Sequence, residues 1–313
     1  MLKQRRGILA HRWRTAAVAS TVAAAIAVPV AMAQASPEPP PEVSAKGAYL
    51  LDTGSDKELM AKAADTRRPM ASTTKIMTAL VVLQTKGLNL KQQVTVKQEY
   101  RDYVAEAGAS TADLQTGDKL TVNQLLYAML LPSGADAAMA LADTFGTGAT
   151  TDERTKSFIS KMNTKARNLG LKNTKFDSFD GLAPRSDNYT TPRDLAHLTE
   201  RAMKNKTFDT VVGSVSTEQE APAANGNTRY YSWDNTNQLL GSYKGAIGVK
   251  TGTTTPAGPC LVFAAERDDR TVVGVLLNDQ KNRYPDAQKM LDWTYDTETK
   301  VKWRQLPKGA QHD

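Results

Sequence analysis

The sequence predicts an α+β fold in which one antiparallel sheet is built from both ends of the chain. Strand-like segments come first and last, and the long middle of the chain has helical periodicity. The predicted strands are 48–52, 58–63, 228–233, 246–251, 260–266 and 271–277. Strands that flank a run of helices are expected to share a sheet, with the helices forming an inserted subdomain. A chain of 313 residues that is 40% hydrophobic can form one large domain of this kind.

The N-terminal segment 1–33 is predicted to be a secretory signal peptide. A basic start is followed by an uncharged, Ala- and Val-rich stretch over 15–32, and Ala31 and Ala33 supply the small residues of a cleavage site. An uncleaved anchor helix is the alternative, because the stretch is near the shortest length that spans a bilayer. We expect cleavage and an exported protein, extracellular or associated with the cell wall.

Most of the basic charge belongs to this segment. Removing it lowers the net charge from +7 to +2, because five basic and no acidic residues go with it. The remaining balance gives no basis for nucleic-acid binding, which needs basic residues clustered on a folded face. No obligate protein partner is indicated. Segment 34–45 is Pro-rich and is expected to be an extended linker, 46–300 is expected to form the main folded domain, and 301–313 is expected to be a polar tail.

The first strand and its hairpin partner are joined by turn residues at 53–56. A helix is then expected to open at Ser72, run to about Lys86 and end at Gly87. Apolar residues cover most of its circumference, and a helix of that kind is buried.

The later helices carry clear start and stop signals. Positions 121–124 have the capping-box pattern, and Thr191-Pro192 has the pattern of a capped first turn. Five further helices are predicted. The first runs from 122 to Leu130, the second covers 135–144, the third ends at Gly170, the fourth begins at Pro192, and the last begins at Pro285.

Ser72 and Lys75 form the single S-x-x-K of the sequence. On a helix, positions three apart share a face, so the amine would reach the hydroxyl. A serine is a weak nucleophile until a base takes its proton, and burial would lower the pKa of the lysine enough for it to serve. A Ser N-cap followed by a surface Lys is the alternative when these residues are taken alone.

Histidine and cysteine usage favours the lysine as the base. Beyond the signal peptide only His197 and His312 occur, and His197 is expected on a helix surface or half-buried, so a Ser-His-Asp triad is poorly supported. Cys260 is the single cysteine, which excludes an internal disulfide and is expected to be a small buried strand residue. No metal-ligand spacing is present, and no metal or cofactor is expected.

Two further fragments become informative beside Ser72 and Lys75. Ser133-Gly134-Ala135 is placed at a helix-to-helix turn that can expose Ser133, although a plain turn would have the same sequence. In 249–253 (Val-Lys-Thr-Gly-Thr), a strand ends in a cation, a hydroxyl and a glycine. Such a strand could pair with an extended peptide that approaches over Gly252, or it could simply end at a glycine turn.

S-x-x-K, an inter-helix Ser-Gly-x and K-T-G, in this order, are typical of penicillin-recognising serine enzymes. The segment 68–80 around Ser72 resembles the nucleophile segment of the D-alanyl-D-alanine carboxypeptidases, which are low-molecular-mass penicillin-binding proteins. The resemblance extends from about Lys46 to Tyr295. It implies the penicillin-binding, β-lactamase-like transpeptidase fold.

The resemblance also implies roles for individual residues. Ser72 would attack the carbonyl of the penultimate D-alanine, Lys75 would take its proton, and Ser133 would relay a proton to the leaving nitrogen. Lys250, Thr251, Gly252 and Thr253 would bind the substrate. In that group Lys250 and Thr251 would hold the terminal carboxylate, and the backbone N–H groups of Ser72 and Thr253 would form the oxyanion hole. The implied substrates are peptidoglycan stem peptides that end in D-Ala-D-Ala, and β-lactams would be covalent inhibitors.

One departure from the family pattern keeps other functions open. The second motif usually ends in Asn, whereas here it ends in Ala135. A non-hydrolytic penicillin-binding sensor or scaffold is therefore one alternative. A β-lactamase of related fold is another, although it would need a second base in an E-x-x-L-N setting, which the sequence lacks.

Overall fold

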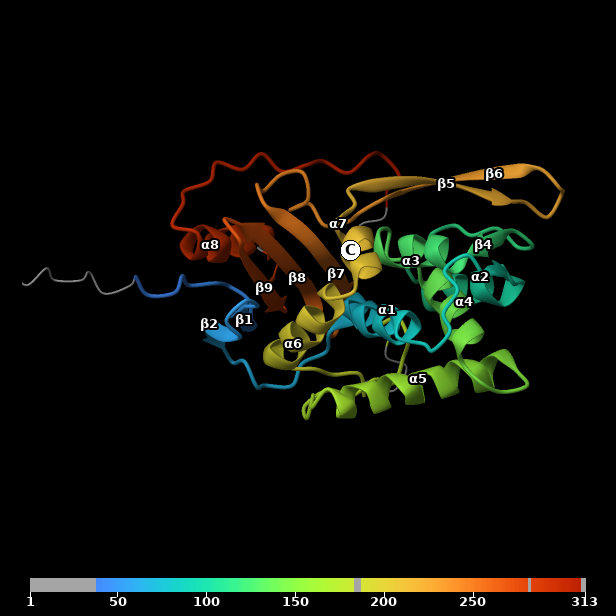
Figure 1. Cartoon of the computed structure of the whole chain (residues 1–313), viewed down its shortest axis with the longest axis horizontal. Helices are drawn as coiled ribbons and strands as arrows, with labels where there is room; N and C mark the ends of the chain where they lie inside the picture. The colour runs from blue at the N-terminus through green and yellow to red at the C-terminus, as the bar shows by residue number, and fades with distance from the viewer. Residues whose placement is uncertain (1–37, 183–186, 281–282, 311–313) are drawn as a thin grey trace, which may run out of the picture. The chain divides into compact units, whose positions relative to one another are not determined.

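The computed structural model describes residues 38–182, 187–280 and 283–310 (Figure 1). Its contacts divide the chain into a unit that ends at Pro39 and a unit that begins at Pro40. Only Glu38 and Pro39 of the first unit are described, so the predicted signal peptide lies outside the described residues. Everything below concerns the second unit.

Within the described residues, the main sheet has five strands in the order β2-β1-β9-β8-β7, and neighbouring strands are antiparallel (Figure 1). The strands are β1 (Gly47–Asp52), β2 (Lys57–Lys62), β7 (Ala246–Thr254), β8 (Gly258–Arg267) and β9 (Arg270–Leu277). The predicted sheet from both chain ends is confirmed, because β1 pairs with β9 along its whole length.

Alternate residues of the sheet face two different sets of buried side chains. Tyr49 and Leu51 of β1 belong to the cluster under the helices, whereas Leu50 belongs to a second cluster that includes Met290 and Leu291 of α8 (Arg283–Thr294). A strand with both faces covered is apolar at successive positions instead of alternate ones. This explains why β8 and β9 are continuous apolar runs.

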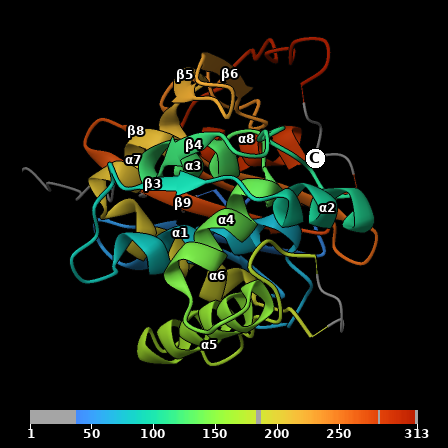
Figure 2. The same ribbon diagram turned by 90° about the vertical axis from the view of Figure 1, so that its right-hand side faces the viewer.

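The helices between β2 and β7 form the inserted subdomain, which Figure 2 shows end-on. They are α1 (Lys75–Leu83), α2 (Gln98–Ala107), α3 (Val122–Leu130), α4 (Ala135–Phe145), α5 (Thr151–Asn168), α6 (Pro192–Met203) and α7 (Lys206–Gly213). Every residue of α1 is buried, which confirms the prediction that this helix is buried. Helices α2 and α7 and the short strand pair β3 (Gln93–Thr95) and β4 (Lys119–Thr121) were not predicted from the sequence.

The predicted bounds of the first helix were wrong at both ends. Ser72 lies in a 3-10 turn, η1 (Ala71–Thr74), and the α-helix begins only at Lys75. Ala71 before it has φ +48°, a left-handed conformation that an α-helix does not contain. The helix ends at Leu83, and the Thr85 hydroxyl then donates to the Val81 carbonyl.

The predicted helix caps are confirmed. The Thr121 hydroxyl accepts from the Gln124 backbone while the Gln124 side chain accepts from the Thr121 backbone, so both halves of the capping box form. The Thr191 hydroxyl accepts from the Asp194 backbone, and Pro192 is the first residue of α6. These local signals are readable in the sequence because both partners lie within one turn.

The predicted strand 228–233 forms, but not in the main sheet. It is β6 (Thr228–Asp234), and it pairs with β5 (Ser216–Pro222) in a separate hairpin that extends over the helical subdomain (Figure 1). Its inward residues find partners among the loops before α3: the Tyr231 hydroxyl donates to Asp118, and the Trp233 indole donates to the Ala112 carbonyl.

Packing at both ends of the folded unit extends beyond the predicted boundaries. Val43 and Ala45, inside the predicted linker, are buried in the second cluster, and Val301 and Trp303 pack against it from beyond residue 300. Trp303 also contacts the Tyr284 ring. Among the residues described, no helix combines the length and the apolar character needed to cross a bilayer.

Candidate active site

The three predicted motifs meet beside the edge of the sheet. The Lys75 Nζ lies 3.0 Å from the Ser72 Oγ and 3.4 Å from the Ser133 Oγ. Lys75 is 2% exposed and Ser133 is fully buried. The spacing argument for Ser72 and Lys75 therefore holds, although the turn between them is 3-10 instead of α-helical.

The conformation at Ser72 depends on a glycine far along the chain. A Cβ at Gly181 would lie 1.9 Å from the carbonyl oxygen of Ala71, so only glycine allows this segment to close against the residue before the serine. Gly181 has φ +100°, which also favours glycine.

Lys75 has a further partner that its spacing in the sequence does not indicate. Its Nζ donates to the backbone carbonyl of Asp180 at 3.0 Å. The Asp180 carboxylate accepts from the Tyr103 hydroxyl at 2.8 Å and from the Leu182 backbone at 3.0 Å. Burial, with the neighbouring Asp180, raises the pKa of Tyr103, so its hydroxyl stays a donor. Tyr103 thus fixes the segment that holds Lys75.

The Ser133 turn is held by the buried carboxylate of Asp136. Ser133 itself has φ +68°, and the Gly134 backbone donates to the Ala128 carbonyl. Asp136 is 1% exposed and accepts four hydrogen bonds, from the backbones of Ala112, Leu114 and Ala137 and from the Thr111 hydroxyl. These bonds attach the start of α4 to the loop between α2 and β4, and they set the position of Ser133.

The Lys-Thr-Gly segment lies inside a strand, not at its end as the sequence suggested. β7 continues to Thr254 and forms one edge of the sheet. Lys250 and Thr251 are buried, and the Thr251 Oγ1 lies 2.5 Å from the Thr236 Oγ1. The Lys250 Nζ donates to the Thr251 carbonyl at 3.0 Å.

The structure adds a second reason for a glycine at 252, beside the predicted approach of a ligand. A Cβ there would lie 2.7 Å from the Ser72 backbone nitrogen and 3.1 Å from that of Thr73. Glycine is therefore needed for the close approach of β7 and the serine turn, before any ligand is considered. The next residue, Thr253, accepts at its Oγ1 from the Arg283 guanidinium at 3.2 Å, a cation that the motifs did not reveal.

A cavity of about 870 Å³ adjoins this site. Met70, Ala71 and Thr253 line it on the side of the serine turn, and Tyr103 and Ile159 line it on the side of the helices. Cys260, by contrast, is buried in β8, and burial raises the pKa of its thiol to about 11. Its predicted structural position is confirmed.

Geometry of this kind defines a class of protein. A serine hydroxyl within hydrogen-bond distance of a buried lysine, next to an edge strand that can accept a peptide, is the arrangement of a serine acyl-transfer enzyme. The α+β architecture that carries it is the penicillin-binding fold expected from the sequence.

Comparison with known proteins identifies the family. Residues 32–281 match the family model described as D-alanyl-D-alanine carboxypeptidase. The chain is 50% identical to the D-alanyl-D-alanine carboxypeptidase of Streptomyces sp. (strain K15), covering 82% of this chain and 88% of that protein. It is 31% identical to DacF of Bacillus subtilis, covering 80% of this chain but only 62% of that protein.

A solved structure agrees with the sequence comparison. The crystal structure of the Streptomyces K15 DD-transpeptidase has a TM-score of 0.81 to this chain, is 50% identical to it, and covers 83% of this chain and 100% of that one. This chain belongs to the D-alanyl-D-alanine carboxypeptidase family.

Proposed function

We propose that this protein is a serine-type D-Ala-D-Ala carboxypeptidase that removes the terminal D-alanine from peptidoglycan stem peptides through an acyl-enzyme on Ser72. The observation that carries the proposal is the contact of the Lys75 amine with both the Ser72 and the Ser133 hydroxyls. One amine can then take a proton at the nucleophile and return it toward the leaving group.

In the acylation step, Lys75 accepts the Ser72 proton as the Oγ attacks the carbonyl carbon of the penultimate D-alanine. Burial disfavours the charged ammonium relative to the neutral amine, which is the form that can act as a base. The C–N bond then breaks, and the proton passes through Ser133 to the departing D-alanine nitrogen. Water attacks the ester in the second step and regenerates the Ser72 hydroxyl.

Charge in the transition state is stabilised by the segments around the serine. The backbone N–H groups of Ser72 and Thr253 are the proposed oxyanion donors, and the contact between β7 and the serine turn brings the two segments together. Lys250 and Thr251 are the proposed ligands of the terminal carboxylate. Arg283 places a second cation at Thr253, and it would strengthen binding of the same carboxylate.

Transfer of the acyl group to an amine is the second candidate reaction. The solved relative of 50% identity is named a DD-transpeptidase, whereas the matching sequence is named a carboxypeptidase. Both reactions share the acyl-enzyme and differ in whether water or an amine attacks it. Product analysis with and without an added primary amine measures how much of the acyl-enzyme reacts with water and how much with the amine.

β-Lactams are proposed to acylate Ser72, because their ring presents a reactive carbonyl beside a carboxylate. Mass spectrometry after exposure to penicillin should place one adduct on the peptide that contains Ser72. Ser72→Ala should fold normally and lose both the adduct and peptide hydrolysis. An adduct that persists in this variant would refute the assignment of the nucleophile.

Turnover distinguishes the alternatives. A carboxypeptidase hydrolyses a D-Ala-D-Ala peptide and keeps its penicillin adduct for a long time. A β-lactamase would release the adduct quickly and leave the peptide intact. A sensor would bind penicillin but hydrolyse neither the peptide nor the penicillin adduct.

We also propose that the protein is exported and acts in the cell wall or the surrounding medium. The support is the sequence pattern of 1–33, with small residues at Ala31 and Ala33. N-terminal sequencing of the exported protein should begin at Gln34 or within a few residues of it. Recovery of only the full-length protein, and only from membranes, would indicate an anchor instead.

A further inference from the structure

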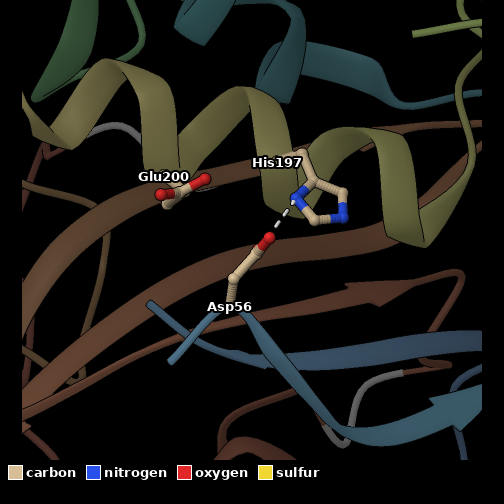
Figure 3. Close-up of side chains that lie close together, drawn as sticks. All are labelled: Asp56, His197 and Glu200. Carbon is tan, nitrogen blue, oxygen red and sulfur yellow. Dashed lines mark ion pairs between the residues drawn. The ribbon is translucent and has the colours of Figure 1, made fainter. Parts of the chain in front are cut away.

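Three side chains with metal-binding atoms lie together on the surface, outside the residues assigned to acyl transfer (Figure 3). Asp56 lies in the turn between β1 and β2, and His197 and Glu200 lie one turn apart on α6. One nitrogen or oxygen atom from each residue lies within 4.8 Å of those from the other two. The His197 Nδ1 faces the Asp56 Oδ1 at 4.0 Å.

The imidazole is oriented by packing. The His197 ring lies against the Tyr49 ring, with the centroids 6.2 Å apart and the planes at 51°. Tyr49 is itself 2% exposed, and its hydroxyl accepts from Arg193 at 3.1 Å. This support leaves the His197 side chain 37% exposed and directs its Nδ1 toward Asp56.

Glu200 forms an ion pair with Lys204 in this structure. The Lys204 Nζ donates to its Oε1 at 2.6 Å. Lys204 is 59% exposed, and an exposed ion pair of this kind contributes little stability. A divalent ion can therefore displace the lysine into water at small cost, whereas the Glu200 side chain is 17% exposed and stays in place.

We propose that Asp56, His197 and Glu200 bind a divalent transition-metal ion such as Zn²⁺. One imidazole nitrogen and two carboxylate oxygens form a donor set that zinc accepts, whereas Ca²⁺ and Mg²⁺ favour oxygen ligands alone. Zinc binds these atoms at about 2.0–2.2 Å, so the three groups must move closer together. Asp56 is 77% exposed and supplies that movement by side-chain rotation.

The bound ion would join two distant parts of the chain. It would connect the β1–β2 turn to α6, which packs against β1 and against α1, the helix that begins with Lys75. The ion would stabilise this part of the fold and would take no part in acyl transfer.

Zinc binding to the untagged protein tests the proposal. Calorimetric titration with Zn²⁺ should show one site that involves His197, and the Tm should rise with the logarithm of the free zinc concentration. His197→Gln should weaken binding by roughly tenfold or more. Lys204→Gln should strengthen it several-fold, because Glu200 loses its competing partner. His312→Gln is the matched control and should bind zinc as the native protein does.

Hydrolysis of a D-Ala-D-Ala peptide should be the same in these variants, which verifies that each is folded. Should His197→Gln fold poorly, Asp56→Asn in the exposed turn replaces it and should weaken zinc binding in the same way. Native-like zinc affinity in the folded His197→Gln or Asp56→Asn variant would overturn the proposal. So would equal binding of Ca²⁺ or Mg²⁺, because the imidazole would then play no part.

Discussion

Gly252 lies directly against the backbone of Ser72, since a Cβ on Gly252 would stand 2.7 Å from the Ser72 nitrogen. That nitrogen is one of the proposed oxyanion donors, so the strand and the nucleophile cannot move independently. The contact joins the K-T-G and S-x-x-K motifs physically, although 180 positions separate the two residues in the sequence.

Gly252→Ala should therefore damage catalysis more than folding. The added methyl group would displace the Ser72 backbone, so its N–H group would no longer point at the oxyanion. Loss of such a donor lowers the rate of the chemical step by roughly two to three orders of magnitude. The rate of acylation by penicillin gives the measurement. Gly54→Ala is the matched control, because its nearest neighbouring atom would lie at 3.6 Å. Native acylation by Gly252→Ala would show that the serine turn can move without cost.

Asp136→Asn should destabilise the protein and slow acyl transfer together. Its buried oxygens accept from three backbone N–H groups and one hydroxyl, and an amide group would turn a donor toward some of them. A buried donor left without an acceptor costs about 1–3 kcal/mol. Urea unfolding measures the loss. Asp113→Asn, at a carboxylate 75% exposed, should change the free energy of unfolding very little.

Ala135 should not prevent activity. The residue is 1% exposed at the start of α4, and its backbone donates to the Ser110 carbonyl, so the turn forms without an Asn side chain. A neutral hydrogen bond contributes about 0.5–1.5 kcal/mol. Ala135→Asn should thus change kcat/KM by about tenfold at most, since 1.36 kcal/mol corresponds to one decade.

Steady-state hydrolysis of one D-Ala-D-Ala peptide tests this expectation. Lys75→Ala should nearly abolish turnover, because the base itself is lost. If the native protein is inert and Ala135→Asn restores turnover by several orders of magnitude, the sensor function would replace the carboxypeptidase.

Asp279 should make the fold less stable as the pH rises through about 6. The side chain is fully buried beside Asp286, and burial first, then the neighbouring carboxylate, raises the pKa of Asp279 to about 6. The folded state holds its proton more tightly than the unfolded state, so the stabilising effect is complete below the unfolded pKa and is lost as the pH rises through the folded pKa. The lowered pKa of Asp286 acts in the opposite direction at acidic pH.

Asp279→Asn should remove this dependence. The variant should gain Tm relative to the native protein at pH 8, and the gain should shrink toward pH 5. Thermal unfolding across this range provides the check. A difference in Tm that does not vary with pH would mean that Asp279 is not the titrating group.

Several local features of the structure could be predicted from short stretches of sequence. The contact of Ser72 with Lys75 and the cap at Thr121 each involve residues within about one turn of one another. Neighbours at such spacing meet almost wherever the chain adopts the local structure. The burial of α1 follows from the apolar residues that cover most of its circumference. The order of strands and helices likewise predicted the sheet from both chain ends.

Partners far apart in the chain were set by tertiary structure alone. Tyr103 donates a hydrogen bond to Asp180, which lies 77 positions further along the chain. Asp56, in the turn between β1 and β2, lies near His197 on α6, and the sequence does not indicate that these two elements are neighbours. The hairpin position of β6 was decided in the same way, by the partners of Tyr231 and Trp233 in distant loops. The sequence by itself determined the fold class and the contact between Ser72 and Lys75, because periodicity and spacing record local contacts. Only the packed chain decided which buried carboxylates hold the catalytic segments in place, because long-range pairs leave no spacing in the sequence.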